Sequence, residues 1–279
     1  MYLNHFQLSR RPFEMTPDPY FLCFTAQHRE AYDGLLYGIR ERKGLIQLVG
    51  EVGAGRATVC RAVLSALGDG VDTALILNPA LDALGLLRAI LRDFGLPCES
   101  MDRLVLLEQL SDFLLERADR GRNVALFIDE AQNLSPEIME EIRLISNLET
   151  DQHKLLQMVL SGQPELDERL ALPALRQLRQ RIAVRCELRP LTRTETDVYL
   201  DYRLIAAGAG DELFFDDHAI RLLHRGSGGI PRLINKAADR ALLAAYARGA
   251  GRVVARDARR ALRELGKVTC EAYEKPRRS

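Results

Sequence analysis

The stretch from Gly50 to Thr58 reads GEVGAGRAT and decides how the surrounding chain is interpreted. Two of its glycines, Gly50 and Gly55, have the separation found in the phosphate-binding pattern G-x-x-x-x-G-K-[ST], in which backbone N–H groups surround the phosphates. Two side chains of that pattern are replaced, because Arg56 occupies the lysine position and Ala57 occupies the hydroxyl position. The stretch therefore predicts a phosphate-binding turn with altered chemistry.

Around this turn, short apolar runs alternate with longer amphipathic runs, which is typical of βαβ units and a parallel sheet. The predicted strands are Leu45–Val49, Ala74–Leu77, Val124–Ile128, Leu155–Leu160 and Ile182–Leu188. The predicted helices between them are Thr58–Leu67, Leu84–Phe94, Leu104–Ala118, Pro136–Leu148 and Pro164–Leu170. The turn thus follows a strand and begins a helix, so that the free N–H groups of the helix would face an anion.

After Pro190 the pattern becomes purely helical. Thr192-Arg-Thr-Glu195 has the spacing of a capping box and predicts a helix through about Ile205. Further helices are predicted over Asp216–His224, Pro231–Ala247 and Ala255–Leu265. An all-helical segment after an α/β body predicts a second, smaller domain, with the boundary near Arg189 to Thr192.

A second motif, Val124-Ala-Leu-Phe-Ile-Asp-Glu130, is an apolar run that ends in two acids. A strand of this kind delivers carboxylates to the crevice where ligands bind in open α/β sheets. In an NTPase, Asp129 would hold Mg²⁺ and Glu130 would polarise the attacking water. An Asp-Glu pair at a strand end is common on protein surfaces, but its combination with the glycine turn favours the nucleotide interpretation.

Further polar residues follow in a fixed order. Gln163 comes at the end of the predicted strand Leu155–Leu160, Arg179 and Arg181 precede the next strand, and Arg232 begins a helix of the second domain. Each arginine alone would be interpreted as a solvated surface residue.

Composition limits the classes of function. The 279 residues carry 39 basic and 39 acidic side chains, so a basic coat over the whole chain is excluded, although a local patch is not. Five scattered cysteines without metal-site spacing predict reduced thiols in a cytoplasmic-type compartment. The sequence shows no secretory leader pattern and no apolar run of membrane-spanning length, so a soluble chain is expected.

The motifs GEVGAGRAT, LFIDEAQNLS, LLQMVLSGQPEL, LRQRI and GGIPRLIN occur in the order found in a known family. With the opening YLNHFQLSRRPFEMTPDPYFL, they make residues 1–265 resemble the AAA+ ATPases typified by general secretion pathway protein A and the related pilus-biogenesis ATPases. The resemblance implies a nucleotide-binding αβα domain (1–190, including an adenine-side segment 1–44), a helical lid (191–268) and a basic tail (269–279). It also implies oligomers in which a neighbouring subunit completes each site.

The resemblance also implies roles for particular residues. Asp129 and Glu130 would form the Walker B acids, Gln163 would be the sensor 1 residue, and Arg232 the sensor 2 residue of the lid. Arg181 would be the arginine finger, with Arg179 as the second candidate. Tyr20 and Phe21 would lie near the adenine of bound ATP or ADP. The Walker A loop would consist of Gly50, Glu51, Val52, Gly53, Ala54, Gly55, Arg56, Ala57 and Thr58.

Family members that hydrolyse ATP read GEVGTGKTT at this loop, so Arg56 and Ala57 are departures from the pattern. Backbone N–H groups do not depend on side chains, and nucleotide binding is therefore expected to survive. Arginine is bulkier than lysine, and alanine removes a Mg²⁺ ligand that Thr58, rotated by about 100°, replaces poorly. We therefore expect weak or absent hydrolysis.

Three functions remain open at this stage. The favoured one is an assembly component of an envelope secretion, pilus or exopolysaccharide system, in a homo-oligomer or a mixed AAA+ ring. Longer family members carry a transmembrane segment and a peptidoglycan-binding domain that this sequence lacks. A membrane-anchored partner would therefore recruit this cytoplasmic chain to the inner membrane. The alternatives are a DNA-associated regulator, with nucleic acid as a less favoured partner, and a non-catalytic oligomeric scaffold.

Overall fold

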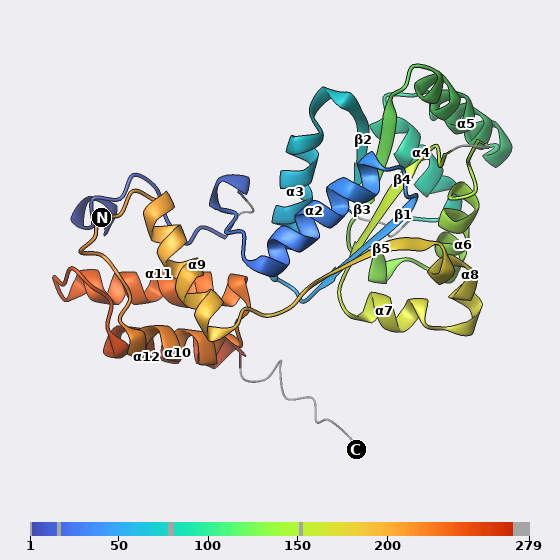
Figure 1. The fold of residues 1–279 in the computed structure, drawn as a ribbon. Coiled ribbons are helices and arrows are strands. Elements are labelled where there is room, and N and C mark those ends of the chain that lie inside the picture. Colours follow the sequence, from blue (N-terminus) through green and yellow to red (C-terminus); the bar gives the residue numbers. More distant parts are fainter. Residues whose placement is uncertain (1, 16–17, 78–80, 151–152, 270–279) are drawn as a thin grey trace. The chain divides into compact units, whose positions relative to one another are not determined.

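The fold was analysed in a computed structural model that describes residues 2–15, 18–77, 81–150 and 153–269 (Figure 1). The chain divides into two compact units. Unit 1 consists of Met1–Thr25, Val52–Gly55 and Arg189–Ser279, and unit 2 consists of Ala26–Glu51 and Arg56–Leu188. The described residues among 2–25, which were predicted to belong to the nucleotide domain, thus lie with the C-terminal helices.

Unit 2 is built on a parallel sheet of five strands in the order β2-β3-β4-β1-β5. The strands are β1 (Leu45–Gly50), β2 (Val71–Ile76), β3 (Asn123–Ile128), β4 (Gln157–Gly162) and β5 (Ile182–Leu188). All residues of β1 and β4 are buried, as expected for central strands covered on both faces. The predicted α/β class with a parallel sheet is confirmed.

Helices cover both faces of this sheet, with α2 and α3 on one side and α4 to α6 on the other (Figure 1). The helices of unit 2 are α2 (Ala26–Arg40), α3 (Arg56–Leu67), α4 (Ala83–Asp93), α5 (Arg103–Asp119), α6 (Pro136–Ile145), α7 (Glu165–Leu170) and α8 (Arg176–Gln180). Short 3₁₀ turns lie at η2 (Gly68–Gly70), η3 (Ala131–Asn133) and η4 (Pro173–Leu175). The side chains of Asp82, Asp102 and Ser135 accept N–H groups at the starts of α4, α5 and α6.

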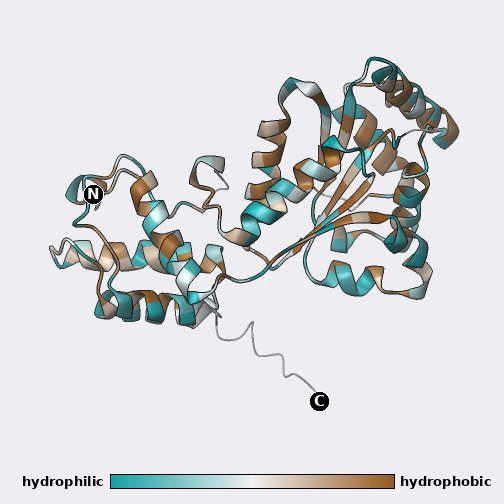
Figure 2. Ribbon diagram, viewed as in Figure 1, coloured by the Kyte–Doolittle hydropathy of each residue, from teal (hydrophilic) through white to brown (hydrophobic). Residues whose placement is uncertain are grey.

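Hydrophobic residues concentrate on the central strands (Figure 2), and together with buried residues of the covering helices they form the core of unit 2. Four of the five strands have bounds that differ from the prediction, and β4 is one of them. β4 begins at Gln157 rather than Leu155, although Leu155 and Leu156 are buried, because its pairing with β3 starts at Gln157 and its pairing with β1 at Met158. Burial of apolar residues therefore extends beyond the hydrogen-bonded strand.

Apart from loops, the described residues of unit 1 form helices. Its helices are α1 (Tyr2–His5), η1 (Pro19–Phe21), α9 (Arg193–Ala206), α10 (Asp217–Ser227), α11 (Pro231–Ala247) and α12 (Ala255–Thr269). The capping box predicted at Thr192 and Glu195 is present at the start of α9. The tail after residue 269 lies outside the described residues. Among the described helices, none combines the length and the hydropathy needed to cross a bilayer.

The core of unit 1 joins segments that are far apart in sequence. Phe6, Phe13 and Phe21 are buried against apolar residues of α9, α10 and α11. The Tyr2 hydroxyl donates a hydrogen bond of 2.8 Å to Asp239 of α11. The N-terminal segment is therefore an integral part of this helical unit.

Candidate nucleotide-binding site

The glycine turn connects the end of β1 to the first residue of α3, which is Arg56. Within it, Ala54 is 1% exposed, and Gly53 and Gly55 have φ angles of 85° and 110°. These positive φ values are accessible to glycine and strained for other residues, which explains the glycines at these positions. The turn follows a central parallel strand, where ligands bind in open α/β sheets.

Gly53 is also in close contact with Arg232 within unit 1. The backbone N–H of Arg232 donates to the Gly53 carbonyl at 3.1 Å. A Cβ atom at Gly53 would lie 2.4 Å from the Arg232 Cβ. Arg232, the predicted sensor 2 residue, therefore lies against the glycine turn, and its own side chain is exposed.

Arg56, at the position of the usual lysine, is buried with 7% of its surface exposed. Its Nη2 atom lies 3.1 Å from Oε1 of Glu130 and forms an ion pair with it. Its Nη1 atom is also buried, and among the described residues it has no hydrogen-bond partner. A buried guanidinium N–H without an acceptor is costly, so this donor is suited to an anionic oxygen supplied by a ligand.

Glu130 receives two more hydrogen bonds at its other carboxylate oxygen. Oε2 accepts from Gln132 Nε2 at 2.6 Å and from Gln163 Nε2 at 3.1 Å. Burial raises the pKa of Glu130, but the hydrogen bonds from Gln132 and Gln163 and the charge of Arg56 outweigh it, and the net pKa is lowered. The backbone of Glu130 is left-handed, with φ 51°, and such strain in a non-glycine residue is found where the surroundings hold the residue in place.

Asp129 is fixed by a separate set of contacts. Its Oδ1 atom accepts from the Ser161 hydroxyl at 2.8 Å and from the Glu130 N–H at 2.9 Å. Ser161 lies on β4, which pairs with β3, and the strand order thus brings these groups together. Beside them, burial first and the charge of Asp129 second raise the pKa of the Cys60 thiol to about 12. Cys60 is therefore a neutral packing residue.

Gln132 was not identified from the sequence, although it connects most of this site. Its Oε1 atom accepts the backbone N–H of Gln163 at 3.0 Å, and its carbonyl accepts from Arg169 Nη1 at 2.6 Å. It is 8% exposed and lies two positions after Glu130. An amide two positions after the Asp-Glu pair was the available signal, because a polar side chain close to a buried strand requires partners.

The structure brings Arg56, Asp129, Glu130 and Gln163 together in unit 2. Arg179 is exposed on α8, and Arg181 is partly buried just after it. Burial, followed by the charge of Arg181, lowers the pKa of Lys154. Neither arginine has a contact to the Arg56–Glu130 pair among the described residues.

Tyr20 and Phe21 lie in unit 1. Tyr20 is 53% exposed, with the Arg10 guanidinium 4.5 Å from its ring centroid, whereas Phe21 is buried beneath Arg203. Residues 16 and 17 of the predicted adenine-side segment lie outside the described residues. Of the two residues predicted to lie near the adenine, Tyr20 therefore has the accessible ring.

The metal-binding capacity of the site is small. Asp129 offers one carboxylate, and Ala57 supplies no hydroxyl. In the described part of the chain, no group of three or more His, Cys, Asp or Glu residues could hold a metal ion. Mg²⁺ retains several waters and is often bound by one or two carboxylates plus substrate phosphates. Asp129 fits such a role only together with oxygens from a bound nucleotide.

Comparison with known proteins agrees with this geometry. Residues 39–170 match the family model described as AAA domain. General secretion pathway protein A of Aeromonas hydrophila is 44% identical over 275 residues, which cover 98% of this chain and 48% of that protein. The chain thus spans about half the length of this curated relative.

Solved structures share the fold at low identity. The ORC2 protein of Aeropyrum pernix, in its ADPNP-ADP complexes, is 19% identical with a TM-score of 0.67, covering 92% of this chain and 72% of that one. Cdc6p of Pyrobaculum aerophilum is 18% identical with a TM-score of 0.68, covering 90% and 70%. At these identities the similarity establishes the fold.

Proposed function

Because this chain is an AAA+ protein related to general secretion pathway protein A, we propose that it is a nucleotide-binding module with weak or absent ATP hydrolysis. The observation that carries the proposal is the ion pair between Arg56 and Glu130. The residue at the lysine position holds the carboxylate that would otherwise polarise water. The site therefore retains a phosphate cradle while its general base is engaged.

Nucleotide binding is supported by the turn itself. The N–H groups of Gly53, Ala54 and Gly55 would hold phosphate oxygens, since this function needs no side chain. Arg56 Nη1, buried without a partner among the described residues, would donate to one of those oxygens. Tyr20, with its exposed ring, would lie near the adenine. Bound ATP would supply the phosphoryl group for any reaction.

Hydrolysis would be impaired for two reasons. Ala57 supplies no hydroxyl to Mg²⁺, so the ion would rest on Asp129, water and phosphate oxygens alone. Arg56 neutralises Glu130 and opposes its action as a base. Each lost hydrogen bond to a charged group costs about 1.5–3 kcal/mol. Two such defects acting in the transition state would slow turnover by roughly two to four orders of magnitude.

The cellular role follows from the relative. The name of that relative assigns it to a secretion pathway, and we extend this to an assembly role in an envelope secretion, pilus or exopolysaccharide system. A membrane-anchored partner would position the chain at the inner membrane. Arg181, with Arg179 as the second candidate, would reach a neighbouring subunit of a homo-oligomer or mixed ring.

The deciding experiment measures binding and turnover separately. ATP and ADP affinities are determined by calorimetry with and without Mg²⁺, and steady-state phosphate release is followed on the same preparation. We expect measurable affinity for both nucleotides, little dependence on Mg²⁺, and release near background. Turnover at the rate of an ordinary AAA+ ATPase, abolished by Glu130→Gln, would contradict weak hydrolysis. Absence of any nucleotide binding would favour a scaffold.

The partner is tested by affinity purification of the tagged chain from detergent-solubilised membranes, followed by mass spectrometry. A membrane protein of an envelope system should co-purify, and nucleotide should change its yield. Nuclease-sensitive recovery of DNA-binding proteins, with no membrane protein retained, would instead favour the regulator alternative.

A further inference from the structure

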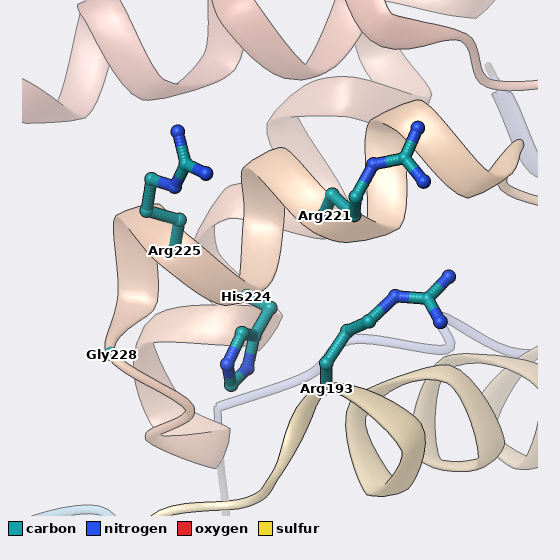
Figure 3. Close-up of a pocket in the computed structure, with 5 residues that line it drawn as sticks. All are labelled: Arg193, Arg221, His224, Arg225 and Gly228. Carbon is teal, nitrogen blue, oxygen red and sulfur yellow. The ribbon is translucent and has the colours of Figure 1, made fainter.

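Unit 1 contains a basic pocket that the proposed nucleotide function does not use. Its volume is about 450 Å³, and it lies between the first turn of α9 and the last turns of α10. It is lined by Arg193, Arg221, His224, Arg225 and Gly228 (Figure 3). Three arginines and a histidine around one pocket form a site for an anion.

Two of these arginines already share an anionic group. The carboxylate of Asp217, the first residue of α10, forms ion pairs with Arg193 through Oδ1 and with Arg221 through Oδ2. One oxyanion is thus held between guanidinium groups from two different helices. Figure 3 shows the side chains of Arg193 and Arg221 on the same side of the His224 ring.

His224 is oriented by a defined hydrogen bond. Its Nδ1 atom lies 3.1 Å from the Thr196 hydroxyl, which donates its own proton to the Thr192 carbonyl at 2.9 Å. The contact with Thr196 therefore orients the His224 ring, and His224 lines the pocket.

Arg225 contributes an uncompensated charge. It is exposed, and among the described residues it has no ion-pair partner. In Figure 3 it lies on the other side of His224 from Arg193, with its guanidinium turned away. The helix dipole favours a cation at the C-terminus of α10. It does not explain Arg193, because Arg193 lies at the start of α9, where the dipole disfavours a positive charge.

We propose that this pocket binds the phosphate group of a small phosphomonoester, with Asp217 as an internal placeholder between Arg193 and Arg221. Planar guanidinium forks match phosphate oxygens, and a dianion balances the three arginines better than the single charge of Asp217. The volume of about 450 Å³ falls within the range of small-molecule sites, and so leaves room for the organic part of the ligand. The proposal does not depend on nucleotide binding at the glycine turn.

The test uses a signal that belongs to the pocket. Glycerol 3-phosphate and inorganic phosphate are titrated into the full chain while the histidine ring resonances are followed by NMR. The chain has five histidines, and the His224 resonance is assigned with His224→Gln. Saturable shifts of His224 are expected with both probes. Phosphate bound at the glycine turn would not satisfy this criterion, so the two sites are distinguished.

Three variants are expected to change the affinity for phosphate in different ways. Arg225→Gln should weaken binding on the order of tenfold, as for one lost charge-assisted hydrogen bond. Asp217→Asn should tighten binding, because the placeholder loses its charge. Arg259→Gln, which removes an equally exposed arginine on α12 outside the pocket, should leave the affinity unchanged. Absence of saturable His224 shifts, weaker binding to Asp217→Asn, or equal losses in Arg259→Gln and Arg225→Gln would overturn the proposal.

The source of the phosphomonoester is resolved by a flotation assay. Phosphatidylcholine vesicles are compared with vesicles that also contain phosphatidic acid, and Arg225→Gln serves as the control. Flotation only with phosphatidic acid would identify a lipid headgroup, whereas binding of soluble glycerol 3-phosphate alone would identify a free metabolite. If duplex DNA shifts His224 and neither phosphate probe does, the pocket belongs to a nucleic-acid surface and the proposal fails.

Discussion

Arg56 and Glu130, 74 residues apart in sequence, form a 3.1 Å ion pair in which Arg56 is buried and Glu130 is partly exposed. The pair connects the first residue of α3 with the turn that follows β3. Removing either partner of a buried pair leaves an uncompensated charge. Substitution of Arg56 in the glycine motif or of Glu130 after β3 would therefore be destabilising.

Restoring the usual loop chemistry should restore catalysis. In Arg56→Lys/Ala57→Thr, the smaller ammonium group would release Glu130 and the hydroxyl would supply a Mg²⁺ ligand. We expect phosphate release to rise by roughly 10²- to 10⁴-fold, measured with saturating ATP and Mg²⁺. Adding Glu130→Gln to this variant should remove the gain. An unchanged rate in the restored variant, with nucleotide still bound, would show that the defect lies elsewhere.

The Glu130 carboxylate should contribute to stability in a pH-dependent way. Its folded-state pKa is lowered from the ordinary value of 4.5, because two hydrogen bonds and Arg56 outweigh the effect of burial. Its contribution is therefore present above about pH 4.5 and is lost as the pH falls through the lower folded-state pKa. The free energy of unfolding of the wild type should exceed that of Glu130→Gln at neutral pH, and the difference should shrink in acid. A constant difference across this range in urea titrations would contradict the shift.

Gly53 should resist substitution. Its φ of 85° is strained for alanine, and the new Cβ would lie 2.4 Å from the Arg232 Cβ. Gly53→Ala should lower the free energy of unfolding by about 1–3 kcal/mol and weaken nucleotide binding. Gly70→Ala is the matched control, because no atom lies within 4 Å of its added Cβ. Equal behaviour of the two variants in thermal unfolding and nucleotide titration would remove the structural reason for this glycine.

Arg203 should be the main attachment of the N-terminal segment within unit 1. It donates to the carbonyls of Pro12 and Glu14, and its guanidinium lies 4.5 Å from the centroid of the Phe21 ring. Arg203→Met keeps much of the volume but leaves two carbonyls without this donor, at a cost of about 3 kcal/mol. Denaturant unfolding followed by circular dichroism measures the loss. The exposed Arg240→Met should change stability by less than about 0.5 kcal/mol.

Much of unit 2 could be predicted because its signals are local. The alternation of apolar runs located all five strands, and β5 was predicted with its observed bounds. β4 was placed two residues early because Leu155 and Leu156 are buried before pairing begins. Hydrophobic pattern reports burial, whereas a strand boundary depends on hydrogen bonds to a neighbour.

The site was predictable in its backbone but not in its side-chain partners. The glycine spacing and the two acids after β3 identified the turn and the carboxylates. Sequence alone did not reveal that Arg56 bends toward Glu130, or that Gln132 donates to the same carboxylate. Such contacts depend on side-chain rotamers and on burial. Both are fixed only when β1, β3 and β4 pair in the sheet. The packing of residues 2–25 with α9 to α11 left no local signal for the same reason.

Unit 1 combines segments that are distant in sequence, and this affects the order in which the protein can fold during synthesis. Residues that are synthesised before the central sheet, such as Tyr2 and Phe6, have their partners in α9 to α11. Domains generally fold as units during synthesis. The central sheet can therefore assemble before the helices that pack against this early segment have been made. Nascent chains that end before α11 should therefore expose an apolar, aromatic-rich tail. Chaperones that capture emerging polypeptides would find their best target there.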